Sequence, residues 1–229
     1  MTPFGNNPTV SFMFELPVTK IDFYTSDIFE VCLERGEYSF ETGECSVLFN
    51  DVGDSRPYSM SSAPQADELS FLVRRLPGGA LSEWLAERKP GDSVCVSAPF
   101  GEFRPAFDSE SLVLIATGVG ISPFLSLIRG SDEDSSLSRP LSIYGLRRLA
   151  EAVELELLKQ KTALQLAVSR EPHTPHFHGR VTDLVDTLPI KQNTEFYLCG
   201  YDSMVNGVSD RLTGRGVHPA RIHTEVFFN

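Results

Sequence analysis

The sequence predicts a two-domain protein, an antiparallel β-barrel followed by an α/β domain with a parallel sheet. Residues 15–105 hold regularly spaced short strand patterns with a single helical one among them, which is typical of a small antiparallel barrel. From Leu112 onward strand and helix patterns alternate, which predicts parallel strands joined by helices. The 229 residues are 41% hydrophobic, enough for packed cores. We place the boundary in the linker 101–111, between domains of residues 1–107 and 108–229.

Composition and charge exclude several classes of protein. The formal net charge of −11, from 20 basic and 31 acidic residues, argues against nucleic acid as a partner. The four cysteines are widely spaced and form no Cys-x-x-Cys pair, so neither a zinc site nor an iron–sulfur cluster is expected. Residues 1–17 lack a basic n-region, and glycines and a proline interrupt the apolar stretch Leu112–Ile128. We therefore expect a cytoplasmic protein with neither a signal peptide nor a membrane span.

The first domain is expected to consist of short strands separated by turns. Three of them are rich in β-branched and aromatic residues: Ile28–Leu33, Ser46–Phe49 and Leu69–Val73. One helix is expected at Leu81–Arg88, because the pattern opens directly after Gly78-Gly79.

The second domain is expected to alternate strands with helices. The predicted strands are Leu112–Ala116, Leu141–Gly145, Leu164–Val168 and Glu195–Cys199. The predicted helices are Pro123–Ile128, Leu149–Gln160, a short one near Asp183–Leu188, and Ser203–Thr213. Ligands bind at the carboxyl ends of the strands in such sheets, so the loops there are candidate binding residues.

A polar segment, Arg56-Pro57-Tyr58-Ser59, follows a turn composition in the barrel. Arginine can hold a phosphate with two hydrogen bonds, and Tyr58 falls on the same side of an extended strand as Arg56. The pair could hold a phosphate-bearing ring system, with the ring on the phenol and Ser59 bonded to a ring nitrogen. An exposed strand with ordinary polar residues is the alternative.

Two glycine turns precede helices and are candidate phosphate sites. Thr117-Gly118-Val119-Gly120 follows an apolar strand, so its glycines could let the main chain approach a diphosphate. It is not the six-residue dinucleotide fingerprint, so an ordinary Rossmann dehydrogenase fits poorly. Gly78-Gly79-Ala80-Leu81-Ser82 is similar, although a plain capped helix has the same pattern.

These segments, together with Leu198-Cys199-Gly200 and Glu225-Val226-Phe227, resemble the ordered motifs of the ferredoxin–NADP reductase family. The resemblance spans the chain beyond its first dozen residues. In that family a barrel binds flavin and the following α/β domain binds a nicotinamide nucleotide, so the resemblance implies FAD as cofactor.

The resemblance implies FAD contacts on the barrel. Within Arg56, Pro57, Tyr58 and Ser59, the arginine would hold the FAD diphosphate, the tyrosine would stack on the isoalloxazine, and the serine would bond near flavin N5. Leu72, Val73 and Arg74 would line the adenosine or ribityl side. Further diphosphate contacts would come from Gly79, Ala80, Leu81 and Ser82.

The resemblance also implies roles in the second domain. Thr117, with Gly118 and Gly120, would touch flavin and nucleotide at the domain cleft. Ser59, Cys199 and Glu225 would form the hydride-transfer site, with Cys199 against the nicotinamide. Phe227 would cover the flavin until nicotinamide displaces it. Because two residues follow Phe227, Phe228 is an alternative lid.

Arginines at the predicted strand ends favour NADPH over NADH. Arg147, Ser169, Arg170 and Arg180 match positions at which NADP-specific members of the family clamp the 2′-phosphate, whereas an NAD enzyme more often shows an acidic residue there. Solvated arginines are the alternative, and we expect Arg148 to be one. No metal site is expected at His173, His176 and His178, because prolines interrupt the segment and no further ligand completes it.

The sequence thus predicts a flavoprotein that passes a hydride from NADPH to FAD and then single electrons to a separate carrier. That carrier would be a ferredoxin, a flavodoxin or an oxygenase component. A basic patch of Arg74, Arg75, Arg88 and Lys89 could bind it. One alternative is an NADH-dependent reductase component of an oxygenase system. The other is a non-catalytic electron-transfer subunit; such subunits often carry a C-terminal cysteine cluster, which is absent here.

Overall fold

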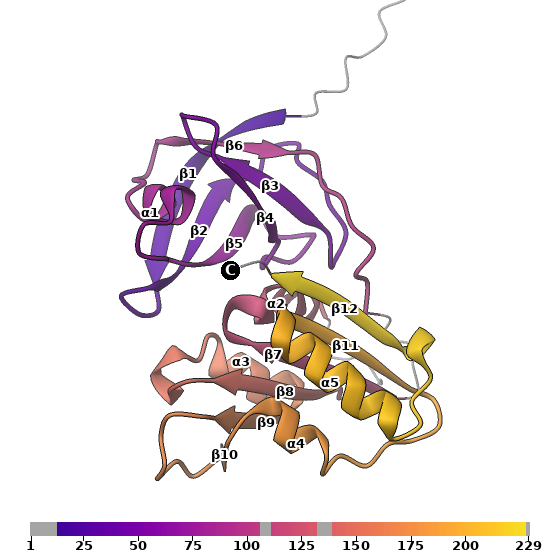
Figure 1. Ribbon diagram of the computed structural model, residues 1–229. Coiled ribbons are helices and arrows are strands. Elements are labelled where there is room, and N and C mark those ends of the chain that lie inside the picture. The colour runs from indigo at the N-terminus through magenta and orange to yellow at the C-terminus, as the bar shows by residue number, and fades with distance from the viewer. Residues whose placement is uncertain (1–12, 106–110, 132–138, 228–229) are drawn as a thin grey trace, which may run out of the picture.

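The computed structural model describes residues 13–105, 111–131 and 139–227, and they form two sheets (Figure 1). The first sheet has six antiparallel strands in the order β4-β3-β6-β1-β2-β5. Its strands are β1 Met13–Phe23, β2 Ile28–Glu34, β3 Cys45–Phe49, β4 Ser55–Ser59, β5 Glu68–Arg74 and β6 Ser93–Ser97. The predicted two-domain fold class is confirmed. The predicted boundary near residue 107 lies outside the described residues.

The first sheet curls into a nearly closed barrel because β1 serves both halves of it. Residues Met13–Pro17 pair with β6, and after an irregularity at Val18 the strand pairs with β2. Where β4 ends, Met60 forms an antiparallel bridge to Phe71 of β5, which joins the two edges of the sheet. The irregularity after Val18 lets β1 bend and twist, so that one strand can pair with both β6 and β2. The strands enclose one apolar core, which the helix α1, Ala80–Ala86, closes with Leu81 and Leu85.

The second sheet is parallel, with the strand order β10-β9-β8-β7-β11-β12. Its strands are β7 Ser111–Thr117, β8 Leu141–Leu146, β9 Ala163–Val168, β10 Phe177–His178, β11 Thr194–Tyr201 and β12 Ile222–Phe227. The apolar run of β7 serves two cores, since side chains alternate along a strand. Leu112 and Leu114 join the cluster under α2, Ser122–Gly130, whereas Val113 and Ile115 join the cluster under α5, Asp202–Gly214.

The long helix predicted at Leu149–Gln160 is wrong. A 3-10 turn, η2 Leu149–Glu151, is followed by a break and then by α3, Leu155–Lys161. The break falls at Glu154, which has a left-handed φ of 53°. The short helix predicted near Asp183 is α4, Val181–Val185, so it begins and ends earlier than expected. No helix in the described part of the chain is long and apolar enough to cross a membrane.

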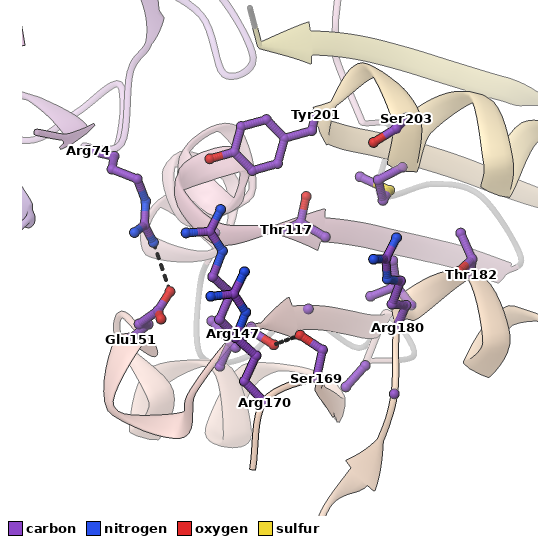
Figure 2. A pocket seen from close by; sticks show the side chains of 17 residues that line it. Arg74, Thr117, Arg147, Glu151, Ser169, Arg170, Arg180, Thr182, Tyr201 and Ser203 are labelled. Atoms are coloured by element: carbon purple, nitrogen blue, oxygen red, sulfur yellow. Dashed lines mark hydrogen bonds and ion pairs between the residues drawn. The ribbon is translucent and has the colours of Figure 1, made fainter. Parts of the chain in front are cut away.

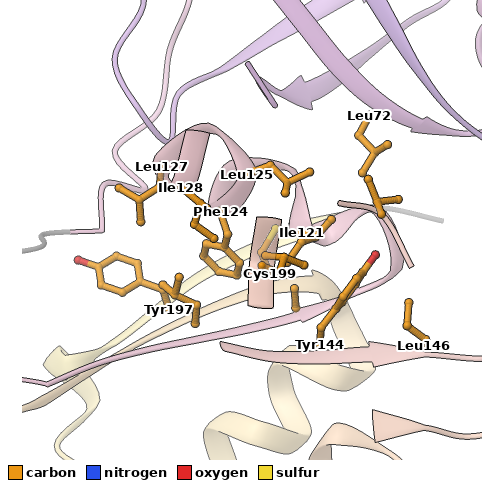
Figure 3. Close-up of a cluster of buried hydrophobic side chains, with 14 of the residues drawn as sticks. Leu72, Ile121, Phe124, Leu125, Leu127, Ile128, Tyr144, Leu146, Tyr197 and Cys199 are labelled. Atoms are coloured by element: carbon orange, nitrogen blue, oxygen red, sulfur yellow. The ribbon is translucent and has the colours of Figure 1, made fainter. Parts of the chain in front are cut away.

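The two domains share a core and a network of buried charges. Ile28 and Leu72 of the barrel belong to the hydrophobic cluster that fills the α2 side of the parallel sheet (Figure 3). Beside it, the guanidinium of Arg129 on α2 binds both carboxylate oxygens of Glu30 on β2, at 2.7 and 3.2 Å. The same guanidinium donates to Glu154 at 2.7 Å. The break before α3 therefore places a carboxylate at the interface between the domains.

Candidate functional site

A pocket of about 380 Å³ opens at the carboxyl ends of β7, β8, β9 and β11 (Figure 2). It contains most of the predicted nucleotide-binding residues: Thr117, Gly118, Arg147, Ser169, Arg170 and Arg180. This is the place that the parallel sheet predicts, since the strands end together there.

Three exposed arginines give the pocket its charge. Arg147 and Arg170 follow β8 and β9, and the Arg170 amide donates to the Arg147 carbonyl at 2.8 Å, which ties the two loops together. Arg180 precedes α4. Within the described residues none of the three guanidinium groups forms an ion pair, so all can receive a phosphate. The hydroxyl of Ser169 donates to the Leu146 carbonyl at 3.3 Å.

Arg74 also lines this pocket, although it comes from the barrel. Its guanidinium donates to Asp27 at 2.5 Å and to Glu151 at 2.9 Å, which links β5 to η2. Glu151 is the only carboxylate among the described lining residues. Because Arg74 neutralises it, the pocket keeps its positive charge.

The other two residues predicted on the strand that carries Arg74 are buried. Leu72 is 2% exposed in the interdomain core, and Val73 is 0% exposed in the barrel core. Arg74 lines the nucleotide pocket. Contact of these three residues with FAD stays a prediction.

The two glycines of the turn after β7 have different reasons to be glycine. Gly118 has a left-handed φ of 54° and lines the pocket. A Cβ on Gly120 would lie 2.5 Å from the carbonyl oxygen of Cys199, so this glycine allows the turn to pack on β11. The hydroxyl of Thr117 is buried without a hydrogen-bond partner in the described structure. An orphaned hydroxyl at the pocket fits a bound nucleotide that supplies its partner.

The three predicted hydride-transfer residues lie together at the junction of the domains. Ser59, at the end of β4, is 1% exposed, and its hydroxyl donates to the Glu225 carboxylate of β12. Its carbonyl accepts from the Ser122 hydroxyl at 2.8 Å. Cys199 of β11 is paired with Glu225 in the sheet register. The nucleotide domain therefore holds Ser59 at both its hydroxyl and its carbonyl.

Burial sets the protonation of this site. It raises the pKa of Glu225, and the Ser59 hydrogen bond lowers it in part. It also raises the pKa of Cys199 well above its usual range, with the nearby Glu225 carboxylate as the second cause. This shift favours the neutral thiol, and Cys199 packs in the interdomain core.

The barrel side of the site exposes one cation. The Arg56 guanidinium is exposed, donates to the Ser55 carbonyl at 2.7 Å, and has no carboxylate partner in the described chain, so it can receive a diphosphate. Tyr58 is partly buried against the barrel core, and burial raises its pKa to about 12. Pro57, between them, is exposed.

The glycine turn before α1 is held by its own serine. The Ser82 hydroxyl accepts from the Leu76 amide at 3.1 Å and donates to the Gly79 carbonyl at 3.2 Å. Ala80 is exposed at the start of the helix, whereas Leu81 is buried in the barrel core. Ser82 and Leu81 thus shape the turn, as in the plain capped-helix alternative, and their contact with FAD stays a prediction.

Three of the four residues of the predicted basic patch form ion pairs. Arg75 lies 3.6 Å from Glu87, and Arg88 lies 3.8 Å from Asp92. Arg74 is bound to two carboxylates. Lys89, the fourth residue of the patch, is exposed and has no ion pair among the described residues, so binding of a carrier there stays a prediction.

Further pocket residues were not predicted from the sequence, namely Glu151, Thr182, Tyr201, Ser203 and Met204. Tyr201 is the last residue of β11 and Ser203 lies two residues beyond it, so the strand-end rule that selected the arginines could have found them. Phe227 is partly buried against the interdomain core, and Phe228 lies outside the described residues. Within the described ranges no group of three or more His, Cys, Asp or Glu could hold a metal ion.

Two family models match the chain. The oxidoreductase FAD-binding domain matches residues 9–104, and the oxidoreductase NAD-binding domain matches residues 114–210. These ranges coincide with the antiparallel barrel and with most of the parallel-sheet domain.

Known proteins of similar sequence are reductases. The ferredoxin–NAD(P)(+) reductase component of naphthalene 1,2-dioxygenase/salicylate 5-hydroxylase systems from Ralstonia sp is 30% identical over 223 residues, 92% of this chain and 68% of that protein. Flavodoxin/ferredoxin–NADP reductase of Escherichia coli (strain K12) is 28% identical over 210 residues, 82% of this chain and 85% of that protein. The chain spans 54% of the toluate 1,2-dioxygenase electron transfer component of Pseudomonas putida.

A solved structure has the same fold. The ferredoxin NADP+ reductase from Neisseria gonorrhoeae with bound FAD and NADP matches with a TM-score of 0.85 at 23% identity, over 95% of this chain and 100% of that chain. With the two domain models and the reductase relatives, this establishes the family. The chain belongs to the ferredoxin–NADP reductase family of FAD-containing NAD(P)H oxidoreductases.

Proposed function

We propose that the protein passes a hydride from NADPH to FAD and then passes single electrons to a separate redox carrier. The carrier would be a ferredoxin, a flavodoxin or an oxygenase component. The observation that carries the proposal is the junction of Ser59 with Glu225 beside a pocket of unpaired arginines. FAD, when bound, supplies the capacity to take up two electrons together and release them singly.

In this proposal each domain holds one ring system. Residues 1–107 bind FAD, with Arg56 on the diphosphate, Tyr58 against the isoalloxazine and Ser59 near N5. Residues 108–229 bind the nucleotide, with Cys199 against the nicotinamide. The Ser59–Glu225 bond and the shared core keep the two sites in register, which hydride transfer requires because the reacting atoms must approach to about 3–3.5 Å.

The charge of the pocket supports a preference for NADPH. Arg147, Arg170 and Arg180 offer guanidinium groups without carboxylate partners, and Arg74 neutralises Glu151. A 2′-phosphate can form bidentate ion pairs with such a set, whereas a neutral ribose hydroxyl cannot. Arg74 thus compensates the negative charge of Glu151, which would otherwise repel a 2′-phosphate.

An absorption spectrum followed by anaerobic titration tests the proposal. We expect flavin bands in the purified protein that bleach fast with NADPH and slowly with NADH. Equal or faster bleaching by NADH would favour the second candidate, an NADH-dependent reductase component of an oxygenase system. The similarity to the Ralstonia reductase component is the reason to keep that candidate. A colourless protein that binds no added FAD would overturn both.

A further inference from the structure

A second hollow, of about 410 Å³, lies between the barrel and β12 and shares no described lining residue with the nucleotide pocket. Its barrel wall consists of Gly43, Cys45, Pro57 and Phe100–Phe103. Its other wall is His223–Phe227. Phe100 is 46% exposed, although it is a large apolar side chain. We call this hollow the β12 groove.

The β12 groove adjoins the hydride-transfer residues. Glu225 lines it and also binds Ser59. Pro57 lines it too, and Tyr58, which would stack on the flavin, is the next residue of β4. Neighbouring side chains of a strand point to opposite faces, so a molecule in the groove would lie one strand's thickness from a ring on Tyr58. β12 is also the edge strand of its sheet in the described structure, a position open to a partner.

The rim of the groove is acidic. Glu102 lines it, is exposed, and has no ion-pair partner in the described chain. Glu41 and Glu44, beside Gly43, share a single guanidinium, that of Arg104, at 2.6 and 3.0 Å. One cation therefore faces three carboxylates. This charge disfavours an anionic nucleotide or an acidic carrier in the groove.

We propose that the electron acceptor is a redox protein with a cationic face that docks over the β12 groove. Its lysines or arginines would meet the exposed carboxylates of Glu41 and Glu102, and its apolar centre would contact Phe100. The inference rests on the proposed function and names the kind of partner. Each NADPH supplies two electrons, so two one-electron acceptors are reduced per NADPH oxidised, and one proton is released.

Steady-state reduction of cytochrome c, a basic one-electron haem protein, tests the proposal. We expect kcat/KM to fall steeply as salt rises from about 20 to 300 mM, because salt screens exposed charges. Glu102→Lys combined with Glu41→Gln should lower kcat/KM at low salt about tenfold and flatten the salt dependence. Glu156→Lys is the matched control. It is 78% exposed on α3, which packs on β9 away from β12, and it should leave both quantities unchanged.

Two parallel measurements separate this proposal from the proposed function. Anaerobic flavin reduction by NADPH and turnover with menadione, an uncharged quinone, should be the same in all variants. If NADPH does not reduce the protein, the proposed function fails, and the docking proposal is then tested by mixing dithionite-reduced protein with cytochrome c. Groove variants equal to wild type with cytochrome c would overturn it. So would faster reduction of an acidic plant-type ferredoxin at low salt, or a dimer that dissociates in the groove variant.

Discussion

Ser59 and Glu225 are 166 positions apart, yet the hydroxyl of one donates to the carboxylate of the other at the junction of the barrel and the parallel sheet. The bond joins β4, which carries the predicted flavin contacts, to β12, which is paired with Cys199 of β11. It is buried, because Ser59 is 1% exposed. One hydrogen bond therefore connects the two halves of the proposed hydride-transfer site.

Ser59→Ala should slow anaerobic flavin reduction by NADPH about 10–100-fold, because it removes the donor to Glu225 and small displacements at a reacting centre are costly. FAD retention and the Kd for NADPH should change little, since the Ser122 bond to the Ser59 carbonyl stays. Stopped-flow absorbance measures the rate, and Ser93→Ala, at the exposed start of β6, is the control. An unchanged rate would remove Ser59 from the site.

Glu225→Gln should change how stability depends on pH. Burial raises the pKa of Glu225 in the folded protein above the value of about 4.3 in an unfolded chain. Between these two values the folded state holds a proton that the unfolded state has released, so this carboxyl's contribution to stability is lost as pH rises through the folded pKa.

The variant has no such proton to lose. Its Tm relative to wild type should therefore be higher at about pH 7.5 than at about pH 4.5, as thermal melts in both buffers would show. Glu156→Gln, at an exposed site, should give the same difference at both pH values. A Glu225→Gln difference that moves the other way would contradict the assignment of burial as the dominant cause.

Arg170→Gln should raise the KM for NADPH about 10–100-fold, the equivalent of one lost charge-assisted hydrogen bond, and leave the KM for NADH within about twofold. Arg148→Gln provides the matched control, because Arg148 is exposed on the same loop as Arg147 but does not line the pocket. Steady-state kinetics would measure the KM of each variant for NADPH and for NADH. Equal effects on NADPH and NADH would mean that Arg170 does not contact the 2′-phosphate.

Patterns along the chain predicted the strands and the pocket, because both depend on local sequence. The apolar run Leu112–Ala116 indicates a strand buried on both faces, and strand-end arginines such as Arg170 fall where the parallel sheet collects its loops. The direction in which a side chain points could not be predicted as well from the sequence. The pattern around Arg74 gave no sign of its carboxylate partners Asp27 and Glu151 or of its place in the lining of the nucleotide pocket.

The break between η2 and α3 is a second feature that the local sequence pattern did not predict. Leu149–Gln160 has a helical apolar pattern, and Val153 and Leu158 are indeed buried. The pattern contains neither the bond between Glu154 and Arg129, two residues of the second domain 25 positions apart, nor the bond of the same guanidinium to Glu30 of the barrel. Glu154 takes a left-handed φ at the break. Contacts between the domains, such as that of Ser59 with Glu225, depend on how the two domains pack together, so a pattern within one segment cannot predict them.

Arg129→Met should lower the apparent Tm by about 4–12 °C. Loss of one partner of a buried ion pair costs about 3–5 kcal/mol, and we expect about 2–3 because the Arg129 side chain is 19% exposed. Glu30 would then be a buried carboxylate without its cation, so Arg129→Met with Glu30→Met should recover part of the loss. Lys159→Met, which breaks an exposed pair with Glu156, should move the Tm by less than about 2 °C. Equal losses in both single variants would mean that the Arg129 network does not hold the domains together.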